Sequence, residues 1–92
     1  MSDANLPKPT LREDLAALSH DQWSGWMKYM FGKCELQGDG TATIPADFVR
    51  RWQRQMTTPY NNLPQSERES DRSEADRMIS VIDLFDADNL ES

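Results

Sequence analysis

Apolar side chains recur at helical spacing in separate segments of this chain, and that periodicity constrains its fold more than any other feature. The clearest stripe has members at positions i, i+4, i+7 and i+11: Trp23, Met27, Met30 and Cys34. Residues in such a series lie on one face of an amphipathic helix. The sequence therefore predicts an all-α fold.

Two capping patterns divide the first third of the chain. Thr10 is followed three residues later by a glutamate, the pattern of a capping box, and this predicts a short helix over 11–18. Ser19 is followed in the same way by a glutamine, which predicts a second helix over 20–33.

Prolines mark the starts of the other two helices. Pro45 suits the first turn of a helix that continues to about residue 56, and Pro64 begins the longest helix, over 64–85. We therefore expect a small orthogonal bundle of three long helices plus a short N-terminal helix. We expect the aromatic and Met side chains of these helices to share one core. A chain of this length buries only about 60–65% of its unfolded surface, so each core side chain counts.

The remaining segments define the domain boundaries. Residues 1–9 carry two prolines and few apolar groups, which predicts a flexible lead. Residues 35–44 contain the turn sequence Gly-Asp-Gly and allow a minor β-hairpin. The prediction is a single helical domain over 10–85, followed by an acidic frayed tail over 86–92.

Charge and cysteine content narrow the class of protein. Residues 61–92 carry three basic and nine acidic side chains. Their net charge of −6 is the same as that of the whole chain. This sign argues against direct nucleic-acid binding, which requires cationic surface. The single cysteine excludes an intramolecular disulfide, and no signal peptide or bilayer-length apolar run occurs, so we expect a cytoplasmic location without membrane association.

No pattern in the sequence indicates catalysis. His20 and Cys34 are each the only residue of their kind, but 14 residues of helix would hold them about 21 Å apart. A calcium loop with Gly40 at its sixth position would have Ala46 at the twelfth, where a glutamate is required. We therefore expect no enzyme activity, no metal site and no cofactor.

Two charged clusters each allow two interpretations. Arg50, Arg51 and Arg54 surround Trp52 and fit either an anion-binding patch or a helix face neutralised by the acidic last helix. We favour the neutralised face. Glu67, Asp71 and Glu74 share one face of the last helix, which we interpret as a charged solvent face rather than as a mimic of DNA.

Two blocks of the sequence resemble a known family. Residues 15–23, LAALSHDQW, and residues 59–72, PYNNLPQSERESDR, are similar to the repeat domain first named in ryanodine receptors. The resemblance covers about residues 11–82. The chain also resembles small proteins of tailed phages and prophages in its WxxW, RWxRQ, TPYxxL and SDRxEAD blocks.

This resemblance implies a helical module without known catalytic residues. Prokaryotic relatives are associated with nucleotide-like ligands, and the repeats of the channels occur in pairs, which implies that a lone copy could form a homodimer. By matching position, the signature residues here are His20, Trp23, Pro59, Tyr60, Leu63, Asp71 and Arg72. The family's Gly-Trp-x-Tyr-Gly block is replaced here by WMKYM at residues 26–30.

We interpret the signature residues after position 58 mainly as structural. Pro59 would fix a bend, Tyr60 and Leu63 would fasten the connector to the core, and Asp71 and Arg72 would dock the last helix through charge-assisted hydrogen bonds. Direct ligand contact is the alternative.

Our leading functional hypothesis is a non-enzymatic, phage-type accessory protein in the host cytoplasm that binds and inhibits or redirects a host protein or nucleoprotein complex. The alternative is a pocket for a nucleotide-like ligand lined by Tyr60, Trp23 and Arg72. The candidate binding residues are His20, Trp23, Tyr60, Asp71, Arg72, Arg50, Arg51 and Arg54.

Overall fold

The computed structural model describes the backbone of residues 10–91 and the side chains of residues 10–88. Its elements, in chain order, are α1 (Leu11–Lys33), β1 (Glu35–Leu36), β2 (Ala42–Thr43), α2 (Ala46–Thr57), the 3-10 turn η2 (Tyr60–Asn62) and α3 (Gln65–Glu91). The predicted all-α fold is confirmed. The predicted lead, residues 1–9, lies outside the described residues.

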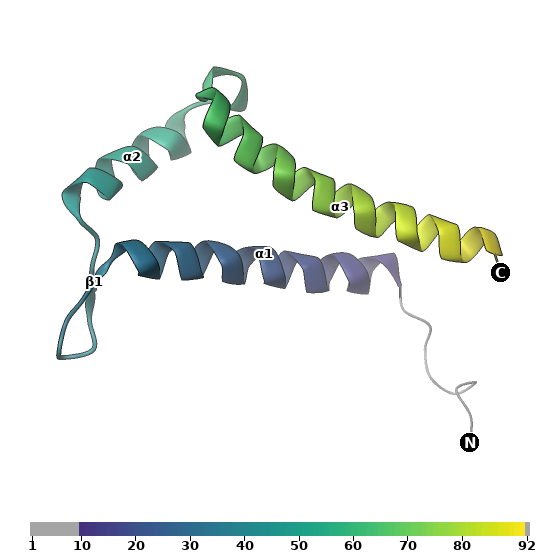
Figure 1. Ribbon diagram of the computed structural model, residues 1–92, viewed down its shortest axis with the longest axis horizontal. Helices are drawn as coiled ribbons and strands as arrows, with labels where there is room; N and C mark the ends of the chain where they lie inside the picture. The colour runs from purple at the N-terminus through teal and green to yellow at the C-terminus, as the bar shows by residue number, and fades with distance from the viewer. Residues whose placement is uncertain (1–9, 92) are drawn as a thin grey trace.

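The three helices form an open triangle (Figure 1). α1 and α3 run in opposite directions and approach each other where α1 begins and α3 ends, while α2 joins their other ends. The principal extents are 55 × 39 × 16 Å, and no helix lies over another when the triangle is viewed down the shortest axis. The helices therefore form a single layer.

This single layer leaves most apolar side chains in contact with solvent. Among the described residues, the buried apolar side chains are Leu18 and Leu63, each 8% exposed. The radius of gyration is 18.8 Å, whereas a compact chain of this length has about 12 Å. The predicted common core is wrong, because enclosing a core takes at least two layers of secondary structure.

α1 is one continuous helix, so the predicted break at Ser19 is wrong. The capping prediction at Thr10 is confirmed, since the Glu13 N–H donates to Thr10 Oγ1 at 3.0 Å. At the second capping pattern, the side chain of Gln22 instead donates to the carbonyl of Glu74 on α3, at 3.2 Å. The glutamine that would close a capping box thus makes a tertiary contact, and the helix continues through residue 19.

The expected β-hairpin is present between α1 and α2. Its strands are antiparallel, with Glu35 opposite Thr43 and Leu36 opposite Ala42. Gly40 has φ of 91°, a left-handed conformation that favours glycine. Asp39 accepts hydrogen bonds from the Thr41 hydroxyl at 2.7 Å and from the Thr41 N–H at 3.0 Å, which fixes the turn.

The hairpin turn should loosen in acid. The hydrogen bonds from Thr41 lower the pKa of Asp39 below its usual 3.8. A carboxylate whose pKa is lower in the folded than in the unfolded state stabilises the fold when it is ionised. The stabilisation by Asp39 is therefore complete above pH 3.8, and it is lost as the pH falls through the lower pKa of Asp39 in the folded state. We expect the Thr41 amide resonance to titrate with a midpoint below 3.8 and this step to be absent in Asp39→Asn. A midpoint at or above 3.8 would contradict the observed turn.

α3 continues to Glu91, beyond the predicted end at residue 85. The tail expected to fray at residues 86–92 is thus helical over its described part, 86–91. No glycine or proline follows Pro64 in the sequence, so no residue with a strong tendency to end a helix interrupts α3.

Candidate functional site: a cleft between three helices

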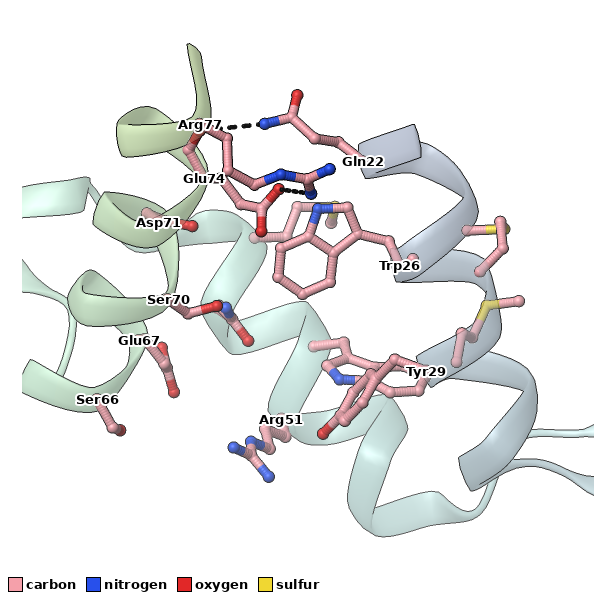
Figure 2. A pocket seen from close by; sticks show the side chains of 16 residues that line it. Gln22, Trp26, Tyr29, Arg51, Ser66, Glu67, Ser70, Asp71, Glu74 and Arg77 are labelled. Atoms are coloured by element: carbon pink, nitrogen blue, oxygen red, sulfur yellow. Dashed lines mark hydrogen bonds and ion pairs between the residues drawn. The ribbon is translucent and has the colours of Figure 1, made fainter. Parts of the chain in front are cut away.

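A cavity of about 750 Å³ lies inside the triangle, and all three helices contribute to its walls (Figure 2). α1 and α2 supply mainly aromatic and Met side chains, whereas α3 supplies mainly polar ones. The lining residues are Gln22, Gly25, Trp26, Met27, Tyr29 and Met30 of α1, Arg51, Trp52, Gln55 and Met56 of α2, and Ser66, Glu67, Ser70, Asp71, Glu74 and Arg77 of α3. We refer to this cavity as the cleft.

The aromatic wall follows from helical spacing. Trp26 and Tyr29 are three residues apart on α1 and so project from the same face into the cleft. The ring centroids of Tyr29 and Trp52 are 6.3 Å apart at an angle of 58°, and those of Phe48 and Trp52 are 5.3 Å apart. These tilted contacts are typical of aromatic pairs, and they hold α1 against α2 at the corner that the hairpin spans.

The opposite wall carries three carboxylates one or two helical turns apart on α3. Glu67 is buried and accepts two hydrogen bonds from the guanidinium of Arg54, at 3.2 and 2.5 Å. Glu74 forms an ion pair with Arg77 at 3.2 Å. Asp71, the third carboxylate, is exposed and lines the cleft between them. It is therefore the carboxylate best placed to meet a positively charged group that enters the cleft.

The corner between α2 and α3 carries polar contacts beside the cleft. Besides the Arg54–Glu67 pair, the Nε of Arg72 donates to the hydroxyl oxygen of Tyr60 at 3.1 Å, and Leu63 is buried. The hydrogen bond to Glu67 raises the pKa of Arg54, and that to Tyr60, with a smaller effect of Glu69, raises the pKa of Arg72. Arg72 thus contacts the connector, whereas the hydrogen bonds expected of Asp71 are not seen among the described side chains.

Of the three arginines on α2, one is neutralised by the acidic last helix, so the favoured interpretation holds for Arg54 alone. Arg54 pairs with Glu67 of α3, and Arg50 pairs with Asp47 of its own helix at 2.5 Å. Arg51 is exposed and lines the cleft instead. The three guanidinium groups therefore do not act together as an anion-binding patch.

The structure brings only part of the predicted site together. Of the eight predicted residues, Arg51 and Asp71 line the cleft. His20 and Trp23 stack on each other on α1, with ring centroids 6.1 Å apart, and are not among the residues that line it. Tyr60 and Arg72 contact each other at the α2–α3 corner. The predicted nucleotide pocket of Tyr60, Trp23 and Arg72 is therefore not formed in the cleft.

Sequence reasoning missed the aromatic wall as a site. Trp26 and Trp52 belong to the aromatic side chains that the sequence predicts either in the common core or at a binding surface, and Tyr29 was not singled out. The signal was present in the i, i+3 spacing of Trp26 and Tyr29, which predicts that both face the same neighbour. Whether these side chains line a cleft depends on the distance between α1 and α3. The spacing of residues along one helix does not predict that distance.

Comparison of the chain with protein-family models, with curated proteins and with solved structures finds no match. Within the described part of the chain, no cluster of three His, Cys, Asp or Glu side chains is arranged to hold a metal ion. None of the described helices combines the length and apolar character needed to cross a membrane.

Proposed function

We propose that this chain is a non-catalytic protein-binding module whose cleft takes an apolar segment of a partner protein with basic residues beside it. The observation that carries the proposal is the pairing of an aromatic and Met wall with a polar wall, on which the carboxylate of Asp71 is exposed, in one cavity of about 750 Å³. Trp, Tyr and Met are enriched where proteins bind one another, because they offer large contact areas that become fully desolvated.

The size of the cleft supports a short anchor rather than a whole folded domain. A helix that docks in a groove inserts a few side chains at i, i+3 and i+4 spacing, and the cavity volume can take side chains on that scale. A Lys or Arg beside the anchor would meet Asp71, whose carboxylate is exposed at the α3 wall. Electrostatic complementarity of this kind mainly fixes orientation and partner choice.

On the resemblance to phage and prophage proteins, we further propose that the partner is a host protein, which is bound so that its activity is inhibited or redirected. The alternative of a nucleotide-like ligand has less support. Three aromatic rings in the cleft could stack on a base, but the exposed carboxylate of Asp71 shares the cavity and would repel phosphates, and Arg51 is the one arginine of α2 that lines it. In addition, Arg50 and Arg54 are already engaged in ion pairs.

Affinity capture from a bacterial host lysate tests the proposal when three tagged proteins are compared: the unmodified chain, Asp71→Lys and Asp83→Lys. Both aspartates are exposed on α3, but only Asp71 lines the cleft, so Asp83→Lys is a matched control for the change in charge. We expect at least one host protein to be enriched by the unmodified chain and by Asp83→Lys, and to be lost with Asp71→Lys.

The absence of any enriched protein, or equal capture by all three baits, would contradict docking in the cleft. A thermal-shift screen against nucleotides separates the alternative, because a ligand at 100 times its dissociation constant adds about 2.7 kcal/mol to the free energy of unfolding. We expect no such stabilisation by any nucleotide in the panel.

A further inference from the structure

A second cavity lies where the start of α1 approaches the end of α3, away from the hairpin (Figure 1). Its volume is about 310 Å³. The residues that line it are Asp14, Ala17, Leu18 and Asp21 of α1 and Val81 and Leu84 of α3. None of these residues lines the cleft, so this cavity, which we call the groove, is a separate feature of the molecule.

The groove combines an apolar floor with two carboxylates. Leu18 is buried and Val81 is half-buried, whereas Leu84 is exposed. Asp14 is four residues before Leu18 and Asp21 is three residues after it, so these three side chains share one face of α1. The two aspartates are about 10 Å apart along the helix axis. Within residues 10–88, no basic side chain forms an ion pair with either of them.

This end of the molecule carries most of the net negative charge. Residues 11–21 contain one basic and three acidic side chains, and residues 78–88 contain three acidic side chains and no basic one. Their combined net charge is therefore −5, compared with −6 for the whole chain. The basic residue, Arg12, is two positions before Asp14 and so projects from nearly the opposite side of α1. The electrostatic potential at the groove therefore favours a cation.

We propose that the groove binds a Lys or Arg side chain of a partner protein. Such a side chain has an alkyl stem that packs on apolar surface and a cationic head that stays at the edge of the water. In the groove the stem would lie on Leu18, Val81 and Leu84, and the carboxylates would pair with the head. An apolar side chain would cover the carboxylates without pairing them, and an acidic one would be repelled. The proposal does not rest on the partner of the cleft, because the two cavities share no residue.

A titration of the full chain, followed by NMR, tests this proposal with two matched probes. Nα-acetyl-lysine amide carries the proposed side chain, and Nα-acetyl-norleucine amide has the same alkyl stem without the ammonium group. We expect the lysine probe to shift the methyl resonances of Leu18, Val81 and Leu84 until they saturate. The norleucine probe should bind at least about threefold more weakly, which is the effect of an ion pair at a partly exposed site.

Removal of the two carboxylates should have the same effect as removal of the ammonium group. The double variant Asp14→Asn/Asp21→Asn should weaken binding of the lysine probe at least about threefold. Asp83→Asn is the matched control and should leave this binding unchanged, since Asp83 is exposed on α3 in the same acidic end but does not line the groove. If circular dichroism shows that the double variant loses helicity, Asp21→Asn alone replaces it, because Asp21 lies outside the first turn of α1.

Equal binding of the two probes would overturn the proposal, because the ammonium group would then contribute nothing. Equal weakening by Asp83→Asn would also overturn it, since the probe would then respond to the acidic surface as a whole. The same holds if the lysine probe causes no saturable shift. Groove resonances that change on dilution without a probe would show that a second copy of this chain, and not a separate partner, occupies the groove.

Discussion

Substitution of His20 by proline should lower the free energy of unfolding by about 3 kcal/mol, the cost of proline in a helix interior. His20 lies within the continuous helix α1, ten residues after its N-cap. A proline there removes one backbone hydrogen bond, and its ring clashes with the carbonyl of Ala16. The same substitution would be tolerated if a helix began after Ser19, because residue 20 would then occupy the first helical position.

Ala46→Pro is the control for this experiment. Ala46 is the first residue of α2 and follows Pro45, whose ψ of 146° is extended and compatible with a following proline. We expect Ala46→Pro to change the free energy of unfolding by less than about 1 kcal/mol. Chemical denaturation followed by circular dichroism measures both values. A small effect of His20→Pro on the free energy of unfolding would contradict the continuous helix α1 and would instead favour the two helices that the capping pattern at Ser19 predicts.

Truncation of Leu63 to alanine should cost about 2–3 kcal/mol, within the range for leucines that leave a cavity. Leu63 is one of two buried apolar side chains among the described residues, and it lies at the corner where α2 meets α3. Loss of this buried side chain should therefore free α3 from α2 as well as lower stability.

Leu36→Ala provides the matched comparison, since the same atoms are removed from a side chain in the hairpin that is 73% exposed. Its effect should stay within about 0.5 kcal/mol. Denaturant midpoints and slopes for both variants distinguish the two positions. Equal losses would mean that Leu63 is no better buried in solution than Leu36.

The local features of this fold were predictable because they depend on neighbouring residues. Thr10 caps α1 through a residue three positions away, and Pro45 and Pro64 each directly precede a helix. The hairpin depends on a glycine at a turn, Gly40. Each of these signals acts within a few residues and is independent of how the helices pack.

The arrangement of the helices was not predictable in the same way. Helical spacing shows which face of α1 is apolar, but it does not show whether another helix covers that face. Trp23 was expected in a core and is exposed, whereas Glu67 was expected on a solvent face and is buried against Arg54. The cleft follows from the separation of α1 and α3, which depends on packing at the corners.

The openness of the triangle is the claim on which the cleft depends. Small-angle X-ray scattering, recorded in line with chromatography on the 10.6-kDa species, measures it directly. The structure predicts a radius of gyration near 18.8 Å for this species. A value near 12 Å, as expected of a compact chain of 92 residues, would mean that the helices close on one another and that the cleft does not exist.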